Sequence, residues 1–262
     1  MIESKANSRL KNLRLLLRDK AARKEQGCFI AEGIKLSMET PAERVREVYV
    51  SESFLMAHEA EAFAKGTEPV VVKDELFDSL CDTKAPQGIL TVAETMIWDE
   101  EAVLGENAPL LLIAESVRDP GNAGTILRSA EAAGAAAVFF SADSAEAENP
   151  KTVRASMGSI FRVPCFYKEN IAQLLRDLSE RGIRSYAAHL EGSVPYDEPD
   201  YTGGSAILIG NESRGLTKEA AAAADARIRI PMCGEVNSLN AAMASGICLF
   251  EAARQRRKQQ AL

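Results

Sequence analysis

The sequence predicts an α/β protein with two parts, a small N-terminal one over residues 1–98 and a larger C-terminal one over residues 109–262. Helical and strand patterns alternate along both parts, which is typical of α/β folds. Residues 99–108 are acidic, lack periodicity and contain turn formers, so we expect a linker there. The 262 residues, 46% of them apolar, are enough for two separate hydrophobic cores.

The N-terminal part begins with a helical pattern over residues 4–23, in which four leucines share one side and basic residues surround the rest. Strands and further helices then follow in alternation, which predicts a small α/β domain. We expect strands at 28–31, 47–50, 69–72 and 88–93, and helices at 33–39, 53–64 and 75–80.

The C-terminal part alternates buried-type strands with helices, which predicts a largely parallel sheet covered by helices. In such a sheet the ligand crevice lies at the carboxyl ends of the strands. We expect strands at 110–114, 136–140, 161–165, 183–188, 206–209 and 226–230, and helices at 125–133, 151–159, 171–181, 217–224 and from 238 onward.

The last strand leads through a Pro-Gly loop into the final helix, for which Ser238 is the expected N-cap. One side of this helix is an apolar stripe with helical spacing. Another side has only small side chains, so we expect a neighbouring backbone to pack closely against it. The stripe comprises Leu239, Met243, Ile247 and Phe250, and the small side comprises Ala241, Ala242, Ala244, Ser245 and Gly246.

Composition argues against several classes of protein. Five widely spaced cysteines never form a C-x-x-C pair, so neither a disulfide framework nor a zinc site is indicated. No stretch approaches 18 consecutive apolar residues, and the charged N-terminus has no signal-peptide core. We therefore expect a soluble cytoplasmic protein with no membrane association and no bound metal.

Charge is distributed unevenly along the chain. Residues 1–24 hold eight Lys and Arg against two acids, a charge of +6, whereas the whole chain has a net charge of −7. The first helix is therefore a basic arm on an acidic body. It is either a solvated helix face or a helix that contacts nucleic-acid phosphates.

Three polar loops each follow a predicted strand, at residues 119–128, 209–216 and 230–240. Their polar side chains would converge if those strands are neighbours in the sheet. Each side chain alone has a structural explanation, as a turn former, a cap or a solvated charge, but three such loops in one domain favour a binding site. The converging candidates are Asn122, Arg128, Glu212, Ser238 and Asn240.

A dinucleotide-binding site is a rival interpretation of the first of these loops. A strand, a Gly-bearing turn and a helix occur in that order, and Asp143 lies 22 residues beyond Gly121. The turn reads Gly121-x-x-Gly124, however, rather than the G-x-G-x-x-G pattern that such sites use. We therefore give this alternative little weight.

The three loops resemble the three motifs of the SpoU (TrmH) family, which are S-adenosylmethionine-dependent RNA ribose 2′-O-methyltransferases of the SPOUT class. The matching segments are DPGNAGTILR (119–128), IGNESRGL (209–216) and IPMCGEVNSLN (230–240). The resemblance covers residues 109–256, and residues 1–98 resemble the ribosomal-protein-like substrate-binding domain that precedes the catalytic domain in many members.

This resemblance implies a function and its residues. The catalytic positions fall on Asn122, Arg128, Glu212, Ser238 and Asn240. The cofactor, S-adenosyl-L-methionine, would be held at Leu190, Gly210, Ile230, Met232 and Leu239. The substrate would be structured RNA, with ribosomal RNA favoured over transfer RNA.

The resemblance also implies a trefoil knot in residues 109–262 and a homodimer formed through this domain. The small side of the final helix and the short residues Ala130, Ala132 and Ala133 suit close helix packing between subunits. Two other functions remain open at this point: a noncatalytic RNA-binding protein, and a knotted methyltransferase that modifies a base.

Overall fold

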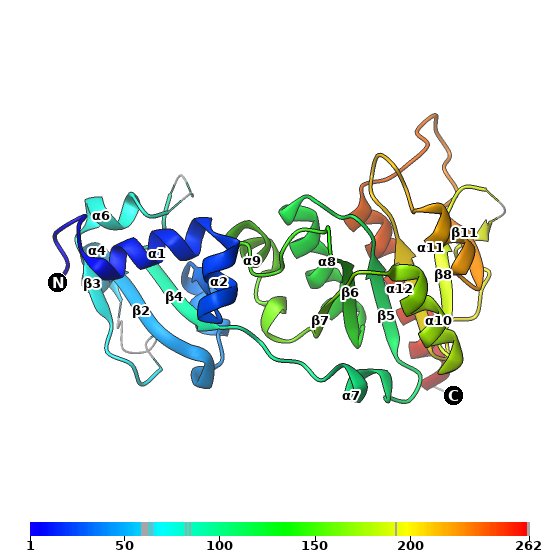
Figure 1. Cartoon of the computed structure of the whole chain (residues 1–262), viewed down its shortest axis with the longest axis horizontal. Helices are drawn as coiled ribbons and strands as arrows, with labels where there is room; N and C mark the ends of the chain where they lie inside the picture. The colour runs from blue at the N-terminus through cyan, green and yellow to red at the C-terminus, as the bar shows by residue number, and fades with distance from the viewer. Residues whose placement is uncertain (59–62, 64, 82, 84, 192, 261–262) are drawn as a thin grey trace. The chain divides into compact units, whose positions relative to one another are not determined.

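The structure is a computed structural model that describes residues 1–262 except 59–62, 64, 82, 84, 192 and 261–262 (Figure 1). The chain forms two compact units. The first unit contains Met1–Ile97 and Glu148–Phe161, and the second contains Trp98–Ala147 and Arg162–Leu262. Among the helices that the structure describes, none combines the length and the apolar run that spanning a bilayer requires.

The first unit is built on a four-stranded mixed sheet. Its strands are ordered β1 (Cys28–Glu32), β4 (Ile89–Glu94), β2 (Val45–Ser51) and β3 (Val70–Val72). The pairs β1–β4 and β4–β2 are antiparallel, whereas β2–β3 is parallel. This arrangement agrees with the small α/β domain that the sequence predicts.

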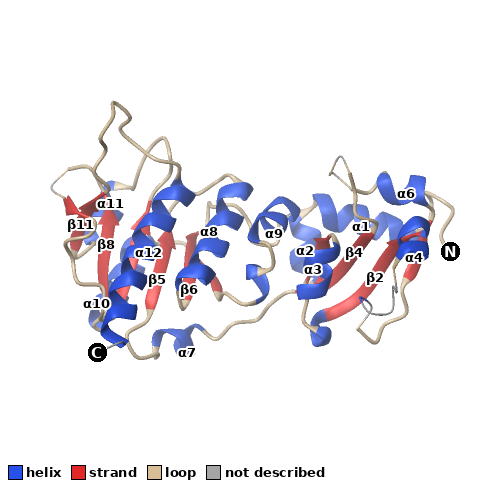
Figure 2. Cartoon of the chain, turned by 180° about the vertical axis from the view of Figure 1, so that it is seen from behind, coloured by secondary structure: helices blue, strands red, loops and turns tan. Residues whose placement is uncertain are grey.

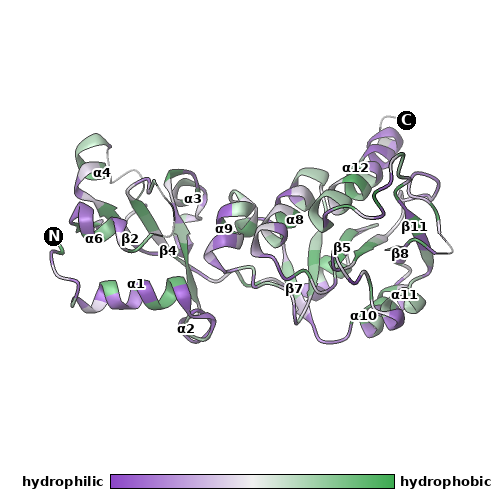
Figure 3. Cartoon of the chain, turned by 90° about the horizontal axis from the view of Figure 1, so that it is seen from above, coloured by the Kyte–Doolittle hydropathy of each residue, from purple (hydrophilic) through white to green (hydrophobic). Residues whose placement is uncertain are grey.

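The basic N-terminal segment forms two helices instead of the single predicted helix. The chain is extended at Asp19, whose carboxylate accepts hydrogen bonds from the N–H groups of Ala21 (2.7 Å) and Ala22 (3.3 Å). Asp19 therefore ends one helix and caps the next. The leucine side of the first helix is buried against the sheet, and its polar and apolar bands alternate in Figure 3. The helices are α1 (Ser8–Arg18) and α2 (Lys20–Gln26).

The remaining helices of the first unit are short. The helix predicted at 53–64 is shorter than expected, because α4 (Glu52–Ala57) ends before His58, whose backbone is extended. Residues 59–62 and 64 of the predicted helix lie outside the described residues. Besides α1 and α2, the described helices of this unit are α3 (Ile34–Glu39), η1 (Ala42–Arg44), α4 (Glu52–Ala57), α6 (Asp74–Asp78), α9 (Pro150–Ser156) and η2 (Ser159–Phe161).

Helix α9 belongs to the first unit although its neighbours in sequence belong to the second. Arg154 donates a 2.9 Å hydrogen bond to Glu32, whose side chain is only 5% exposed. The helix ends at Met157, which adopts a left-handed conformation, so it is shorter than the predicted 151–159. The strand predicted at 161–165 is wrong in position, because Phe161 ends η2 and the strand begins at Cys165.

The second unit contains a seven-stranded sheet in which every pair is parallel, which confirms the predicted parallel-sheet domain (Figure 1). The strand order is β7-β6-β5-β10-β8-β11-β9, so β10 lies between two strands that precede it in the chain. The strands are β5 (Leu110–Ala114), β6 (Ala137–Ser141), β7 (Cys165–Lys168), β8 (Arg184–Ala188), β9 (Val194–Pro195), β10 (Ser205–Ile209) and β11 (Ala226–Arg229).

Helices cover both faces of this sheet. Helices α8 (Pro120–Ala133) and α12 (Ala241–Gln260) lie side by side on one face, across β5 and β10 (Figure 2). Helices α10 (Ile171–Glu180) and α11 (Lys218–Ala223) pack on the other face. The segment predicted as a linker contains helix α7 (Glu100–Leu104), whose last two residues are buried in the same core.

The small side of α12 is used within the chain. Ala242 is 4% exposed, and a side chain added at Gly246 would contact Ser129 of α8. The apolar stripe lies instead toward solvent, with Met243 60% and Phe250 46% exposed. The small residues of α12 therefore pack within the chain and are not a free surface for a second subunit.

The C-terminal half of α12 is held by the half-buried guanidinium of Arg256. Arg256 donates to the backbone carbonyls of Tyr201 (2.9 Å), Ala108 (2.7 Å) and Gly203 (2.6 Å). These carbonyls belong to the segments that lead into β5 and β10. Arg256 therefore fixes the start of the two central strands whose far ends carry the site.

Candidate active site at the carboxyl ends of the parallel strands

The loops that carry the candidate residues meet because their strands are parallel neighbours. Ala114 at the end of β5 is paired with Ile209 at the end of β10, and Ala188 of β8 is paired with Ile228 of β11. All these strands end at one edge of the sheet, so the loops that follow them lie together. These loops span residues 115–119, 189–193, 210–217 and 230–240.

A cavity of about 490 Å³ opens between three of these loops. Its walls are mainly apolar, and two acids, Glu191 and Glu212, and two arginines, Arg214 and Arg229, line it as well. Such dimensions are typical of small-molecule sites, which span about 300–1,000 Å³. The structure places all five residues that resemblance assigned to the cofactor at this cavity: Leu190, Gly210, Ile230, Met232 and Leu239.

Three of the predicted catalytic side chains form one hydrogen-bonded chain. The Asn240 side-chain amide donates to the Asn122 side-chain oxygen (2.9 Å), and the Asn122 amide nitrogen donates to the Glu212 carboxylate. Asn240 also accepts from the backbone N–H groups of Ala242 (3.0 Å) and Met243 (3.2 Å). The three motif loops are thus joined through their side chains.

Asn240 is therefore the N-cap of α12, and the prediction that Ser238 caps this helix is wrong. Ser238 precedes the helix by three residues and lines the cavity instead. Both residues are suitable cap types, and the sequence does not show where the extended loop ends.

Arg128 does not enter the cavity. It is an exposed residue of α8, six residues beyond Asn122. With a rise of about 1.5 Å and a turn of about 100° per residue, it lies roughly 9 Å along the helix and on a different side. Glu212 is bonded to Asn122 rather than to Arg128.

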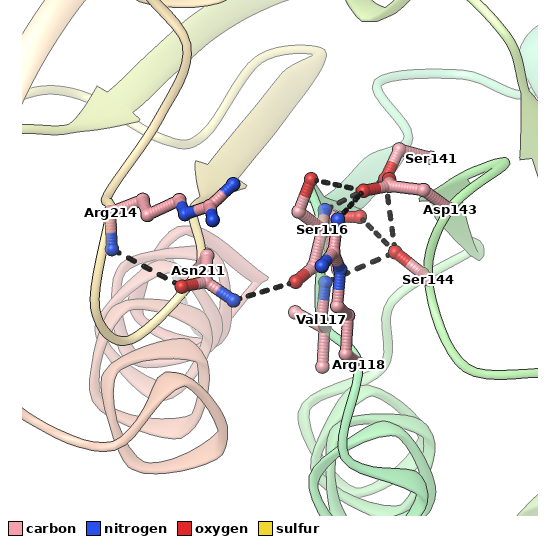
Figure 4. Close-up of polar contacts among 9 residues, drawn as sticks. Ser116, Val117, Arg118, Ser141, Asp143, Ser144, Asn211 and Arg214 are labelled. Atoms are coloured by element: carbon pink, nitrogen blue, oxygen red, sulfur yellow. Dashed lines mark hydrogen bonds and ion pairs between the residues drawn. The ribbon is translucent and has the colours of Figure 1, made fainter.

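The loop from Gly210 to Gly215 is a tight hairpin that presents Glu212. Asn211 and Gly215 exchange backbone hydrogen bonds of 3.1 and 2.8 Å. A Cβ atom at Gly210 would overlap the backbone of Gly215, so only glycine fits there. The Asn211 amide donates to the Ser116 carbonyl (2.9 Å), which ties this loop to the loop after β5 (Figure 4).

Glu115 is a functional residue that sequence reasoning missed. It directly follows the apolar strand β5, is only 6% exposed, and accepts hydrogen bonds from the backbone N–H and the hydroxyl of Thr217, both 2.8 Å. Thr217 in turn caps α11. A lone acid at the end of an entirely apolar strand was the signal in the sequence that could have found it.

Asp143 supports the loop after β5 and does not resemble a ribose-binding acid. It accepts hydrogen bonds from the Ser116 hydroxyl (2.8 Å), the Ser141 hydroxyl (2.7 Å) and the Arg118 guanidinium (3.1 Å) (Figure 4). These contacts, the Ser141 hydroxyl foremost, hold the pKa of the Asp143 carboxyl below its ordinary value. The network holds Ser116 in a left-handed conformation, with φ of 56°. This role accounts for the acid that suggested a dinucleotide site.

The structure places one histidine at the cavity. His189 lines the cavity, but its Nδ1 atom lies 3.1 Å from the Glu191 N–H and accepts a local hydrogen bond. Within the described residues, no cluster of three or more His, Cys, Asp or Glu side chains is arranged to hold a metal ion.

A fully parallel sheet with a polar, cavity-forming edge defines this unit as an α/β ligand-binding domain. Residues 109–250 match the SpoU rRNA Methylase family, and residues 7–91 match the MRM3-like substrate binding domain. The chain belongs to the SpoU family.

Curated relatives and solved structures agree with this assignment. The chain is 29% identical to the Bacillus subtilis 23S rRNA (guanosine(2553)-2′-O)-methyltransferase RlmP, over 95% of this chain and 97% of the relative. It is 33% identical to a 23S rRNA (guanosine-2′-O-)-methyltransferase RlmB from Xanthomonas axonopodis, over 84% and 92%. An AdoMet-bound rRNA methyltransferase from Sinorhizobium meliloti superposes with a TM-score of 0.83 at 31% identity, covering 97% of both chains. The SpoU methyltransferase AviRb from Streptomyces viridochromogenes, in complex with AdoMet, gives 0.84 at 28% identity, covering 96% of this chain and 98% of AviRb.

Replacing Gly210 tests whether the hairpin is as tight as the contacts indicate. Gly210→Ala should lower the free energy of unfolding by about 1–3 kcal/mol, because backbone atoms must move to accept the methyl group. Gly203→Ala is the matched control, since a Cβ atom there meets nothing within 4 Å. Equal urea midpoints for the two variants would contradict the close approach.

Proposed function

We propose that this chain transfers a methyl group from S-adenosylmethionine to a ribose 2′-hydroxyl of ribosomal RNA. The observation that carries the proposal is the cavity at the carboxyl ends of the strands, which the second and third SpoU motifs line. Beside it, Asn122 of the first motif is hydrogen-bonded to Glu212 and Asn240, so the three motifs are joined at the cavity wall. The relatives named as 23S rRNA 2′-O-methyltransferases support ribosomal RNA as the substrate. With that substrate, the enzyme would work in the cytoplasm.

The residues around the cavity fit this cofactor. Ile230 and Leu239 offer apolar walls for an adenine ring, and the loop at Gly210 brings backbone polar groups to the same space. The carboxylates of Glu191 and Glu212 suit a ligand that carries positive charge. The bound cofactor would supply an electrophilic methyl group.

The chain's own residues would orient the ribose and stabilise its 2′-oxygen as the proton leaves. A ribose hydroxyl is a weak nucleophile, so its proton must pass to a flanking phosphate or a water as the bond between its oxygen and the methyl carbon forms. Asn122 and Asn240 would hold the nucleotide, Glu212 would anchor Asn122, and Ser238 would fix the third loop. Arg128 would grip a phosphate that flanks the ribose and stabilise the developing alkoxide, because a guanidinium stays protonated and cannot act as an ordinary base.

Arg128→Lys tests this function and the role of Arg128 together. Lysine keeps the charge but loses the planar fork, so turnover on ribosomal RNA should fall on the order of 100-fold. The affinity for S-adenosylmethionine, measured by calorimetry, should stay unchanged because Arg128 lies outside the cavity. The assay follows labelled methyl groups and maps 2′-O-methyl sites.

Arg176→Lys, an exposed arginine of α10, is the matched control and should retain full activity. Full single-turnover methylation by Arg128→Lys would overturn the assignment. Methyl groups found on a base, or RNA binding without any transfer by the wild-type protein, would favour one of the two other functions.

We also propose that residues 1–98 bind the RNA, that residues 99–108 connect them to the catalytic domain, and that residues 109–262 form a trefoil knot. The match of residues 7–91 to a substrate-binding domain supports the first statement. Family resemblance supports the knot, and the insertion of β10 between β5 and β8 is compatible with it.

The basic surface for RNA lies on α1 and α2. A shallow hollow there is lined by Lys11, Arg14, Arg18 and Lys20 together with the exposed Leu15 and one acid, Asp19. Arg23 does not contribute to this surface: it is 2% exposed, and its guanidinium donates to the Leu16 carbonyl (2.7 Å). The cations that can reach phosphates are therefore fewer than the sequence suggests.

Removing the hollow's cations should weaken RNA binding and its dependence on salt. Replacing Lys11, Arg18 and Lys20 with Ala should lower the slope of log K against log salt by about one unit for each phosphate that the protein no longer neutralises. Lys35→Ala, an exposed lysine of α3, should change neither quantity. An unchanged slope in the triple variant would mean that the helix is only solvated.

We further propose a homodimer formed through the catalytic domain. Met243 and Phe250 leave an apolar face of α12 exposed, and Ala132 of α8 is exposed as well. Burial of such a face against a second copy would be favourable by roughly 25 cal/mol per Å² of apolar area. This surface replaces the small side of α12 that the sequence suggested.

Phe250→Glu should dissociate the dimer, because a carboxylate would be buried without a partner. Light scattering at micromolar concentration measures the mass. Leu55→Glu, which changes an apolar residue of the first unit that is 40% exposed, should leave the mass unchanged. A monomeric wild-type protein would remove the proposal.

A further inference from the structure

Arg214 is a cation at the cavity to which neither resemblance nor the motif residues give a role. It lies at the tip of the hairpin, two residues beyond Glu212, and lines the cavity. Its side chain is exposed, and among the described residues its guanidinium has no hydrogen-bond or ion-pair partner. An arginine held at a ligand cavity with its five donors unused is suited to bind an anion.

Hydrogen bonds hold the backbone of Arg214 in place. The Arg214 backbone N–H donates to the Asn211 side-chain oxygen (3.2 Å), and the Asn211 amide donates to the Ser116 carbonyl (2.9 Å). The hairpin itself is closed by the close approach of Gly210 to Gly215. Figure 4 shows the Arg214 side chain extending from its own loop toward the loop of Ser116.

The other arginines near the cavity are already occupied or lie elsewhere. Arg118 forms an ion pair with Asp143 (3.1 Å), and Arg229 donates to the Ser193 carbonyl. Arg128 does not line the cavity. In the part of the chain that the structure describes, Arg214 is thus the cavity-lining arginine that remains free to bind a ligand.

We propose that Arg214 binds one of the two phosphates that flank the target ribose, the other being left to Arg128. This inference rests on the proposed function. A ribose that brings its 2′-hydroxyl into the cavity necessarily brings the phosphate on the adjacent carbon to the cavity mouth. The carboxylates of Glu191 and Glu212 would repel that phosphate, so a guanidinium beside them offsets the repulsion.

The position of Arg214 favours RNA over the cofactor as its ligand. The side chain is exposed at the loop tip, on the side from which a polymer must approach, whereas the apolar walls at Ile230 and Leu239 are less exposed. A guanidinium fork matches two phosphate oxygens, which gives orientation as well as affinity. Arg214 therefore sets how the target nucleotide enters.

Arg214→Gln tests the proposal in the full-length protein. With saturating S-adenosylmethionine, KM for ribosomal RNA should rise about tenfold, and the salt slope of RNA binding should fall by about one unit. The calorimetric Kd for S-adenosylmethionine should stay within about twofold of the wild-type value, since the proposed contact is with RNA only. Arg214→Lys should recover part of the RNA affinity, and Arg176→Gln should behave as wild type.

Two outcomes would overturn the proposal. A weaker Kd for S-adenosylmethionine with an unchanged RNA slope would assign Arg214 to the cofactor carboxylate, and no change in either would make it a solvated side chain. Failure of the proposed function gives a different result, because a wild-type protein that binds RNA and cofactor but transfers no methyl group still reports the Arg214 contact through the salt slope.

Discussion

The parallel pairing of β5 with β10 is the constraint on which the site depends. Because Ala114 and Ile209 are paired, the loops that follow them start side by side. Two contacts then fasten these loops together: the Glu115 carboxylate holds Thr217, and Asn211 holds the Ser116 carbonyl. The hydrogen bond between Asn122 and Glu212 depends on these two contacts, because they hold the loop that carries Glu212.

The free-energy cost of breaking these hydrogen bonds explains why they persist. A carboxyl group that is 6% exposed, like that of Glu115, is costly to bury unless its oxygens are hydrogen-bonded, and both accept from Thr217. Ser116 has a positive φ, which costs of order 1 kcal/mol or more for a residue with a side chain. Its hydroxyl, N–H and carbonyl all have partners, in Asp143, Ser141 and Asn211. A loop that strays breaks several hydrogen bonds at once, so these contacts keep the loop after β5 and the loop after β10 together.

The loops converge because β5 and β10 are neighbours, a strand order that local patterns do not specify. Sequence periodicity did predict the parallel sheet, because apolar runs are local signals. It failed where tertiary contacts decide between local options. Asp19 interrupts the helical pattern predicted for residues 4–23, and Asn240 caps a helix that Ser238 could also have capped. Met243 and Phe250 have the spacing of a buried stripe, yet the small residues of α12 face α8. The role of Glu115 depends on Thr217, which is 102 residues away in sequence.

Helix α8 separates the two candidate functional residues of the first motif, Asn122 and Arg128. Its N-terminus, capped by Asp119, directs Asn122 to Glu212 and the cavity. Helical geometry then places Arg128 roughly 9 Å away along the axis and on another side of the helix. A substrate that contacts both residues must therefore extend from the cavity across the surface of α8. A single nucleotide bound in the cavity would leave Arg128 unused, which is why the geometry suits a polymer whose charges continue beyond the reacting ribose.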